Sequence, residues 1–567
     1  MLNQHDIAQL HPSTFIIKMQ CYTRESFMEE YTLPVKPAQD FERAGIPAQY
    51  ASGHPKNWSQ TRDVIDFSAD LPQPSETTYR SYDTAVSSDK KLLAISSSAG
   101  RILVYNIQTR QLCEVLEGGG SVAFRPSVAN GESHSEIEQT SGVGTSRPGY
   151  TLVSSVADET QRSERTTGQL ILWDLDQNGR TLDKEEPIDP SIWATKAIDA
   201  IAPELAANHE WTREFIDASS LHTEFLKALS HVAADHSRRH NTIIDNAELG
   251  NFGSKYFSKD GRLMLYHSNA RTTQHGMRAA EDLPLVVIYD VEAGKEMHRL
   301  TGHTDAIMWS AMSPNMECVA TVSWDGSLRM YSVSTGALIW ATDKSGGQSW
   351  AGAFSPDSKL IVWSTNSGSV VQAHDVSDGR KVAVMPETFS RWCRYFDWHP
   401  TRSEIALCAG KEAYVWNPLD GPNGKVLQHF KIEGEERLSM AEIDAVLWMN
   451  EGRLLGIESS EGSNLIYDTE SNAKELFYRP AGTVAGYVTG SLCGMFRDKE
   501  EQDVYLSVDG DGTARFWRTS VPALPSWWDK DPIPVVTKKA FPETGKYVKI
   551  TKASGKAALP HEAAKES

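Results

Sequence analysis

The chain has 567 residues, of which 40% are hydrophobic and 23% are charged, so it can bury a large core and cannot be disordered throughout. Its formal net charge of −19 disfavours nucleic acid and membranes as main partners, because an acidic surface repels phosphate. No apolar run reaches about 18 residues, so we expect no transmembrane helix. Six cysteines without a CxxC pair indicate reduced thiols, and therefore a protein of the cytoplasm or nucleus.

Residues 1–61 are predicted to form an N-terminal extension. Residues 15–23, FIIKMQCYT, have the composition of a strand, whereas the prolines spread over residues 34–55 indicate irregular structure. The extension lacks the basic and then apolar order of a signal peptide, which agrees with an intracellular protein. Residues 62–69, RDVIDFSA, then alternate apolar and polar side chains, as expected of a half-buried strand.

One short pattern then recurs eight times between about residues 80 and 519. A turn residue, often glycine, is followed about five residues later by a ring side chain and a polar residue. The ring positions are Tyr105, Trp173, Tyr289, Tyr331, His374, Trp416, Tyr467 and Trp517. Five of their seven spacings are 42–51 residues, and the two longer ones must contain insertions. Each copy also contains short β-branched runs bounded by turn residues, which predicts a series of antiparallel strands.

The copy at residues 301–332 is the most informative. It contains Gly302-His303, then Ser323 and Asp325 before a turn glycine, and then Tyr331-Ser332. This stretch resembles a WD40 repeat almost position for position, and residues 509–518 are similar, with Asp511 and Trp517. Most copies lack the Gly-His pair, so the resemblance is to the superfamily and to no closer family. It implies an all-β fold with one β-propeller over residues 62–519, for which we expect eight blades, with seven as the alternative.

The resemblance also implies a structural role for the polar residues of the repeat. In such blades the His, Ser and Asp form a buried hydrogen-bond network, which the strand-end Trp or Tyr covers. The residues expected to act in this way are His303, Ser323, Asp325, Tyr331, Asp511 and Trp517. A Ser/His/Asp set also occurs in hydrolases, but the spacing here is that of the repeat.

Two insertions interrupt the early repeats. Residues 127–149 are polar and are predicted to be a flexible loop inside the second blade. Residues 187–247 have helical periodicity and are predicted to form amphipathic helices between the second and third blades. Their apolar stripe includes Trp211, Phe215, Phe225 and Leu229. We expect most of this stripe to pack on the propeller and the remainder to bind a partner.

The last repeat ends near residue 520 and has no following strand. Because an open sheet edge is a liability, we predict that residues 62–69 pair beside Thr513–Arg518 and complete the last blade. Residues 520–567, rich in Lys, Ala and Pro, are predicted to be a partly disordered tail.

The sequence contains no strong signal for a cofactor or a metal ion. His236 and His240 are spaced to share a metal on a helix, but they lack a carboxylate helper and flank two arginines. DGDGT at residues 509–513 fails the calcium-loop pattern, and no phosphate loop or GxSxG elbow is present. We therefore expect no cofactor, no metal and no catalytic residue.

The resulting hypothesis is a non-catalytic scaffold that binds other proteins or peptides, as a monomer within a larger complex. Nine of the 16 tryptophans fall between residues 309 and 448, and we expect one or two of them to be exposed partner anchors. The alternative is an enzyme with its active site in the central channel, either a hydrolase or sialidase-like. Three or more paired Asp, Glu, His or Arg side chains in the channel would favour the enzyme. A channel lined by backbone and small residues would favour the scaffold.

Overall fold

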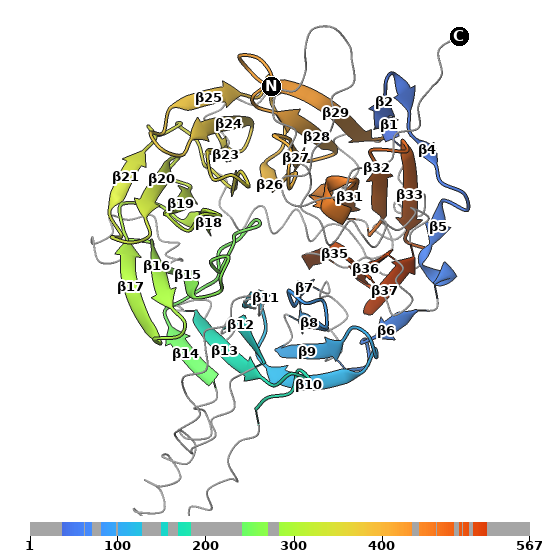
Figure 1. Cartoon of the computed structure of the whole chain (residues 1–567), viewed down its shortest axis with the longest axis horizontal. Helices are drawn as coiled ribbons and strands as arrows, with labels where there is room; N and C mark the ends of the chain where they lie inside the picture. Colours follow the sequence, from blue (N-terminus) through green and yellow to red (C-terminus); the bar gives the residue numbers. More distant parts are fainter. Residues whose placement is uncertain are drawn as a thin grey trace, which may run out of the picture.

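The protein is described by a computed structural model. It covers residues 37–61, 63–70, 81–97, 100–126, 149–156, 168–182, 241–269, 283–433, 442–460, 462–480, 487–489, 492–497 and 503–518. Within these residues, eight sheets are arranged as blades around a central axis (Figure 1). The chain is therefore an eight-bladed β-propeller, which confirms the predicted fold class and the preferred blade number.

Blades 1 and 2 are listed here from the inner to the outer strand. Blade 1 contains β7 (Ser81–Val86), β8 (Leu92–Ser97), β9 (Arg101–Asn106) and β10 (Leu112–Glu117), and β34 (Tyr487–Thr489) pairs with the inner edge of β7. Blade 2 contains β11 (Val122–Phe124), β12 (Tyr150–Val156), β13 (Gln169–Leu175) and β14 (Asn241–Asp245).

Blades 3, 4 and 5 follow in chain order. Blade 3 contains β15 (Leu263–Ser268), β16 (Leu285–Asp290) and β17 (Lys295–Leu300). Blade 4 contains β18 (Ile307–Met312), β19 (Cys318–Ser323), β20 (Leu328–Ser332) and β21 (Leu338–Ala341). Blade 5 contains β22 (Gly352–Phe354), β23 (Leu360–Thr365), β24 (Val370–Asp375) and β25 (Lys381–Val384).

Blades 6, 7 and 8 complete the ring. Blade 6 contains β26 (Cys393–Trp398), β27 (Ile405–Ala409), β28 (Glu412–Asn417) and β29 (Lys425–Ile432). Blade 7 contains β30 (Ile443–Met449), the short 3₁₀ turn η4 (Asn450–Gly452), β31 (Leu454–Ser459), β32 (Asn464–Asp468) and β33 (Ala473–Tyr478). Blade 8 contains β35 (Leu492–Arg497), β36 (Asp503–Asp509), β37 (Thr513–Arg518) and β6 (Val64–Asp66).

The eight ring positions of the repeat all lie on the strand next to the outer strand of a blade. Each of these side chains is buried, with an exposure of 8% at most. Seven of them belong to apolar clusters that fill the seams between neighbouring blades, and His374 stacks on Trp340 of blade 4. One cluster, for example, combines Tyr105 of β9 with Phe516 of β37, on either side of the seam between blades 1 and 8. The repeat is visible in the sequence because every blade needs the same bulky residue at the same place in its seam.

The ring closes with a strand from the N-terminal side. β6 pairs antiparallel with β37, with Asp66 opposite Thr513 and Val64 opposite Arg515. This confirms the predicted closure and supplies the outer strand that the last repeat lacks. Backbone groups on the outer side of β37 are thereby paired instead of being left open.

The described part of the N-terminal extension is more regular than the predicted irregular segment. β1 (Pro37–Gln39) pairs with β29, whereas β4 (Gln49–Tyr50) and β5 (Lys56–Asn57) pair in parallel with β33. The segment also contains a short hairpin, in which β2 (Glu42–Arg43) pairs with β3 (Ile46–Pro47), and the 3₁₀ turn η1 (Trp58–Gln60). We call residues 37–66 the belt, because they follow the outer rim of blades 6, 7 and 8 (Figure 1).

Two aromatic side chains of the belt are buried against the blades. Phe41 is fully buried and stacks between Phe430 of blade 6 and Tyr467 of blade 7, at centroid distances of 5.0 and 4.4 Å. Trp58 is 1% exposed and packs in a cluster that joins blades 7 and 8. Burial of two large aromatic side chains stabilises the attachment far more than the few strand pairs of the belt do.

The predicted boundaries of the helical insertion are partly wrong. Residues 241–245 form strand β14 and pair with β13, so the insertion lies inside blade 2 and not between blades 2 and 3. The sequence NTIID satisfies strand propensity locally, which the helical pattern upstream obscured. Residues 183–240, 127–148 and 519–567 lie outside the described residues. Within the described residues, no helix is long and apolar enough to cross a membrane.

Candidate functional site

The polar network of blade 4 is a closed set of short hydrogen bonds. His303 Nδ1 lies 2.9 Å from Asp325 Oδ2, and His303 Nε2 lies 2.7 Å from Thr321 Oγ1. Burial lowers the pKa of His303, so the neutral ring donates from Nδ1 to Asp325 and accepts from Thr321 at Nε2. Ser327 Oγ also donates to Asp325, at 2.6 Å. The His303 and Asp325 side chains are each only 1% exposed.

Ser323 and Tyr331 make further hydrogen bonds around this set. Ser323 Oγ donates to the Asp305 carbonyl at 2.8 Å and accepts from the Asp325 N–H at 3.1 Å, whereas Thr321, two residues earlier on β19, is the hydroxyl that contacts His303. Tyr331 donates to the Thr301 carbonyl at 2.8 Å. Alternate residues of a strand share a face, so Thr321 and Ser323 were equally compatible with the sequence pattern.

Blade 8 builds its polar network around an arginine. Trp517 Nε1 donates to Ser507 Oγ at 3.0 Å, and Ser507 donates to Asp509. Arg515 then bridges Asp509 at 2.8 Å and Asp511 at 2.6 Å. Arg515 is 7% exposed and Asp509 is 2% exposed. The blade 8 network is therefore centred on an arginine of β37 and not on a histidine, and the sequence resemblance did not reveal it.

A buried Ser–His pair joins blades 3 and 4. His267 Nε2 lies 2.9 Å from Ser310 Oγ, and both residues are 2% exposed. Burial lowers the pKa of His267 to about 4. A nucleophile and its base must reach the substrate, so a pair enclosed in a seam is suited to holding two blades together.

A segment of blade 3 that precedes β15 contacts the inner strand of blade 4. Among the described residues, blade 3 has three regular strands, and residues 250–256 run along β18 of blade 4 (Figure 1). The Asn251 N–H donates to the Met308 carbonyl at 3.0 Å and the Lys255 N–H to the Ser310 carbonyl at 3.1 Å. Phe252, in the turn of this segment, has a φ of 50°, an uncommon conformation for a bulky residue.

Three inner strands, β18, β26 and β30, carry a β-bulge at their second residue, and the bulge of β18 is at Met308. The register of β26 with β27 skips Arg394, and the register of β30 with β31 skips Asp444. Bulges re-aim side chains and are common beside functional sites. Because propeller blades are related by rotation about the axis, the first residues of β26 and β30 lie at the same face of the ring. We call this end of the channel its mouth.

Four aromatic side chains and Arg394 form a cluster at the mouth. Trp350 is central: its ring centroid lies 4.9 Å from Trp392, 5.3 Å from Trp324 and 5.6 Å from Phe252. The Arg394 guanidinium lies 4.1 Å from the Trp392 centroid and 4.8 Å from the Trp350 centroid. We call Phe252, Trp324, Trp350, Trp392 and Arg394 the mouth cluster.

Exposure singles out one member of the mouth cluster. Trp392 is 44% exposed, whereas Trp350 beneath it is 6% exposed. Among the described tryptophans, Trp392 is the exposed one. The sequence could not select it, because the residues that hold it come from blades 3, 4, 5 and 6.

The inner strands also carry three aspartates with raised pKa values. Burial raises the pKa of Asp83 and of Asp444 to about 7, and that of Asp397 to about 6. Asp83 accepts from the Val122 N–H at 3.2 Å, and Asp397 accepts from the Trp448 N–H at 2.6 Å. Both bonds reach the inner strand of the next blade, so these carboxylates link blades at the channel wall.

The channel wall therefore matches neither the enzyme expectation of paired charged side chains nor the scaffold expectation of backbone and small residues. It carries Asp and Arg side chains, as an enzyme would require, but Asp83 and Asp397 are bonded to backbone. Near Asp444, burial and the charge of Glu442 raise the carboxyl pKa, whereas the Arg394 guanidinium lowers it. Among the described residues, no group of three His, Cys, Asp or Glu side chains is placed to hold a metal ion. The candidate partner-binding residues Trp211, Phe215, Phe225 and Leu229, and the pair His236 and His240, lie outside the described residues.

Comparison with known proteins adds little to this geometry. The chain matches no known protein-family model and no curated protein sequence. Among solved structures it is similar to the computationally designed protein Ika8, at 12% identity, over 81% of this chain and 100% of that chain. The TM-score is 0.44, so the likeness carries no functional argument.

Proposed function

We propose that the protein is a non-catalytic, intracellular interaction scaffold whose partner contacts the mouth cluster. The observation that carries this proposal is Trp392, a half-exposed tryptophan held by Trp350 and Arg394. Tryptophan and arginine are the residues most enriched among interface hot spots. A platform whose side chains are already fixed loses little conformational entropy when a partner binds.

We further propose that the propeller is of the WD40 type. The blade 4 network of His303, Thr321 and Asp325 and the closing strand β6 support this assignment. The acidic composition supports protein or peptide partners over nucleic acid. The eight ring residues, each on the strand next to the outer strand of its blade, agree with the same superfamily.

The test compares two exposed apolar residues. Trp392→Ala removes the anchor, and Leu419→Ala removes a 54% exposed side chain from a turn of blade 6. Partners purified with each variant from the source cells are quantified against those of the unmodified protein. We expect Trp392→Ala to lose at least one partner that Leu419→Ala retains, with melting temperatures unchanged. Retention of every partner by Trp392→Ala would refute the proposal.

The insertion that the sequence predicts to be helical is a second candidate surface. Its test is replacement of residues 187–240 by a short Gly/Ser linker, which leaves strand β14 intact. A partner lost only in this variant would assign binding to the insertion, whereas retention of all partners would make the insertion purely structural.

One observation favours the enzyme alternative. Asp83, Asp397 and Asp444 come from three different blades, and raised carboxyl pKa values near neutrality suit general acid–base chemistry. A screen with chromogenic esters and glycosides tests this alternative. Turnover that Asp397→Asn abolishes, without a change in melting temperature, would support an enzyme and contradict the non-catalytic proposal.

A further inference from the structure

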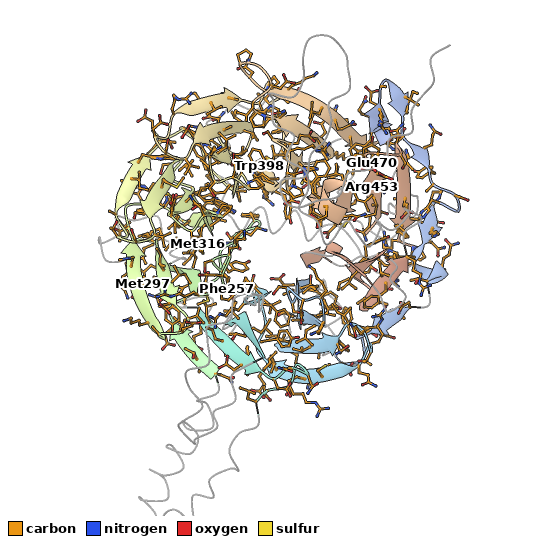
Figure 2. All side chains as sticks on the ribbon, in the orientation of Figure 1. Phe257, Met297, Met316, Trp398, Arg453 and Glu470 are labelled. Carbon is orange, nitrogen blue, oxygen red and sulfur yellow. The ribbon has the colours of Figure 1, made fainter. Side chains whose placement is uncertain are left out.

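The chain enters the belt at the mouth side of blade 6. β1 is the outermost strand of the blade 6 sheet, and β26 is the innermost. A row of paired residues runs from the first residue of β1 to the first residue of β26. Its pairs are Pro37–Ile432, Gln39–Lys431, Lys431–Glu412, Glu412–Ala409 and Ala409–Cys393. Trp392 directly precedes Cys393, so the chain before Pro37 joins the ring at the same face as the mouth cluster. Figure 2 labels Trp398, which ends β26 at the other face.

The other end of the chain leaves the ring at the opposite face. β37 ends at Arg518, which is paired with Val504 of β36. Val504 is in turn paired with Phe496, near the last residue of the inner strand β35. Inner strands begin at the mouth, so Arg518 lies at the face away from it. Residues 519–567 are also rich in lysine, which does not complement the arginine of the mouth cluster. Of the two ends of the chain, residues 1–36 are therefore the better placed to contact the mouth.

Two arginines surround the exposed Trp392. The Arg394 guanidinium stacks on the Trp392 ring, and the Arg391 side chain is 58% exposed. Arg391 lies over the turn between β27 and β28, because a Cβ added at Gly410 would be 2.7 Å from its Cγ. Its ion pair with Glu442 is long, at 3.5 Å, and the Glu442 side chain is 41% exposed, so this pair holds Arg391 weakly. The surface therefore offers an apolar ring and positive charge, which suits an acidic and aromatic ligand.

The segment that precedes Pro37 has the complementary composition and sufficient reach. Residues 25–31, ESFMEEY, contain three glutamates, two aromatic residues and no basic residue. An extended chain spans about 3.3 Å per residue, so these residues can lie up to about 20–40 Å from Pro37. The path from β1 to β26 crosses four strand spacings of about 4.8 Å each, or about 19 Å in all. Residues 25–31 can therefore reach Trp392 from the rim of blade 6.

We propose that residues 25–31 bind to the mouth cluster of the same chain, with their glutamates toward Arg391 and Arg394 and an aromatic side chain against Trp392. Because the segment and the cluster belong to one chain, their effective concentration is high, and individually weak contacts are sufficient. A partner that binds the mouth cluster must then displace the segment. This competition rests on the proposed function of the mouth cluster, whereas the contact within the chain does not.

The test is photo-crosslinking of the full chain with a benzophenone amino acid in place of Phe27. We expect mass spectrometry of the monomer to show a crosslink from position 27 to residues 390–394. Arg391→Glu should lower the crosslink yield by about fivefold, because it replaces an attraction with a repulsion. Lys425→Glu is the matched control: it makes the same charge reversal on β29, at the opposite face of blade 6, and should leave the yield unchanged.

Hydrogen–deuterium exchange provides a second measurement, which needs no substitution within the blades. The double variant Glu29→Lys/Glu30→Lys reverses the charge of the segment and leaves the sequence of every described strand unchanged. The amides of residues 390–394 should exchange faster in this variant than in the unmodified protein. Equal exchange in both, a crosslink to another surface, a crosslink only between two chains, or equal effects of Arg391→Glu and Lys425→Glu would each overturn the proposal.

Partner capture distinguishes this proposal from the proposed function. A crosslink together with full partner retention by Trp392→Ala would support the contact within the chain and refute the partner site. No crosslink together with partner loss by Trp392→Ala would refute the contact and support the partner site. If both hold, Glu29→Lys/Glu30→Lys should capture about fivefold more of the partner that Trp392→Ala loses, and an unchanged amount would refute the competition.

Discussion

Blades 4 and 8 have the same four-stranded plan but depend on different parts of the chain. Blade 4 is built from residues 307–341 alone, and its polar network is centred on a neutral histidine. Blade 8 takes its outer strand from residues 64–66, and its network is centred on Arg515 between two carboxylates. One blade is therefore complete within its own repeat, whereas the other depends on a segment more than 400 residues away.

This difference shows where the ring is most easily opened. Loss of a contact in blade 4 leaves its strands connected by short turns. Loss of the belt leaves β37 with an open edge and exposes the seam between blades 7 and 8, because Trp58 packs there with Phe477 and Tyr505. The stability of the whole ring should therefore respond more to the belt than to a single repeat.

The largest expected effect is that of Trp58→Ala. Trp58 is 1% exposed, and truncation of a buried tryptophan costs about 3–5 kcal/mol. Trp392→Ala is the matched control, because Trp392 is 44% exposed and should cost less than about 1 kcal/mol. The free energy of unfolding in urea is the measurement. Equal losses for the two variants would show that the belt does not hold the ring closed.

A smaller loss is expected for Arg515→Ala. Removal of the guanidinium leaves Asp509 buried without its cation, which costs about 3 kcal/mol at pH 8. Burial already raises the pKa of Asp509 to about 7, so at pH 5 this carboxyl is neutral and the loss should shrink. Arg515→Lys, which cannot bridge both carboxylates equally, should fall between the two. A loss that does not change between pH 5 and pH 8 would contradict the network.

The smallest effect is a gain in stability for Asp444→Asn. The pKa of Asp444 is about 7 in the folded chain and 3.8 in an unperturbed aspartate. Between these values the folded chain holds a proton that the unfolded chain has released, so stability from this group falls as pH rises. The variant should melt roughly 1–3 °C above the unmodified protein at pH 8 and at the same temperature at pH 4. A lower melting temperature at pH 8 would show that the carboxylate is stabilising.

Prediction from the sequence succeeded where the pattern is local and repeated. The eight ring positions identified the strand next to the outer strand in every blade, and the alternation of residues 62–69 identified the closing strand. It failed at a boundary, because the NTIID strand was assigned to the predicted helical segment that precedes it. It also did not single out Thr321, which contacts His303 from the same strand face as Ser323.

Sequence alone determined the propeller and its blade number, because alternation, turns and one bulky residue per seam are short-range requirements that every blade must meet. Tertiary structure alone decided which polar residues meet, where the belt binds and which tryptophan stays exposed. The mouth cluster joins Phe252 of blade 3 to Trp324, Trp350 and Arg394 of blades 4, 5 and 6. Contacts between residues so far apart in the chain depend on the closed ring, and no local pattern encodes them.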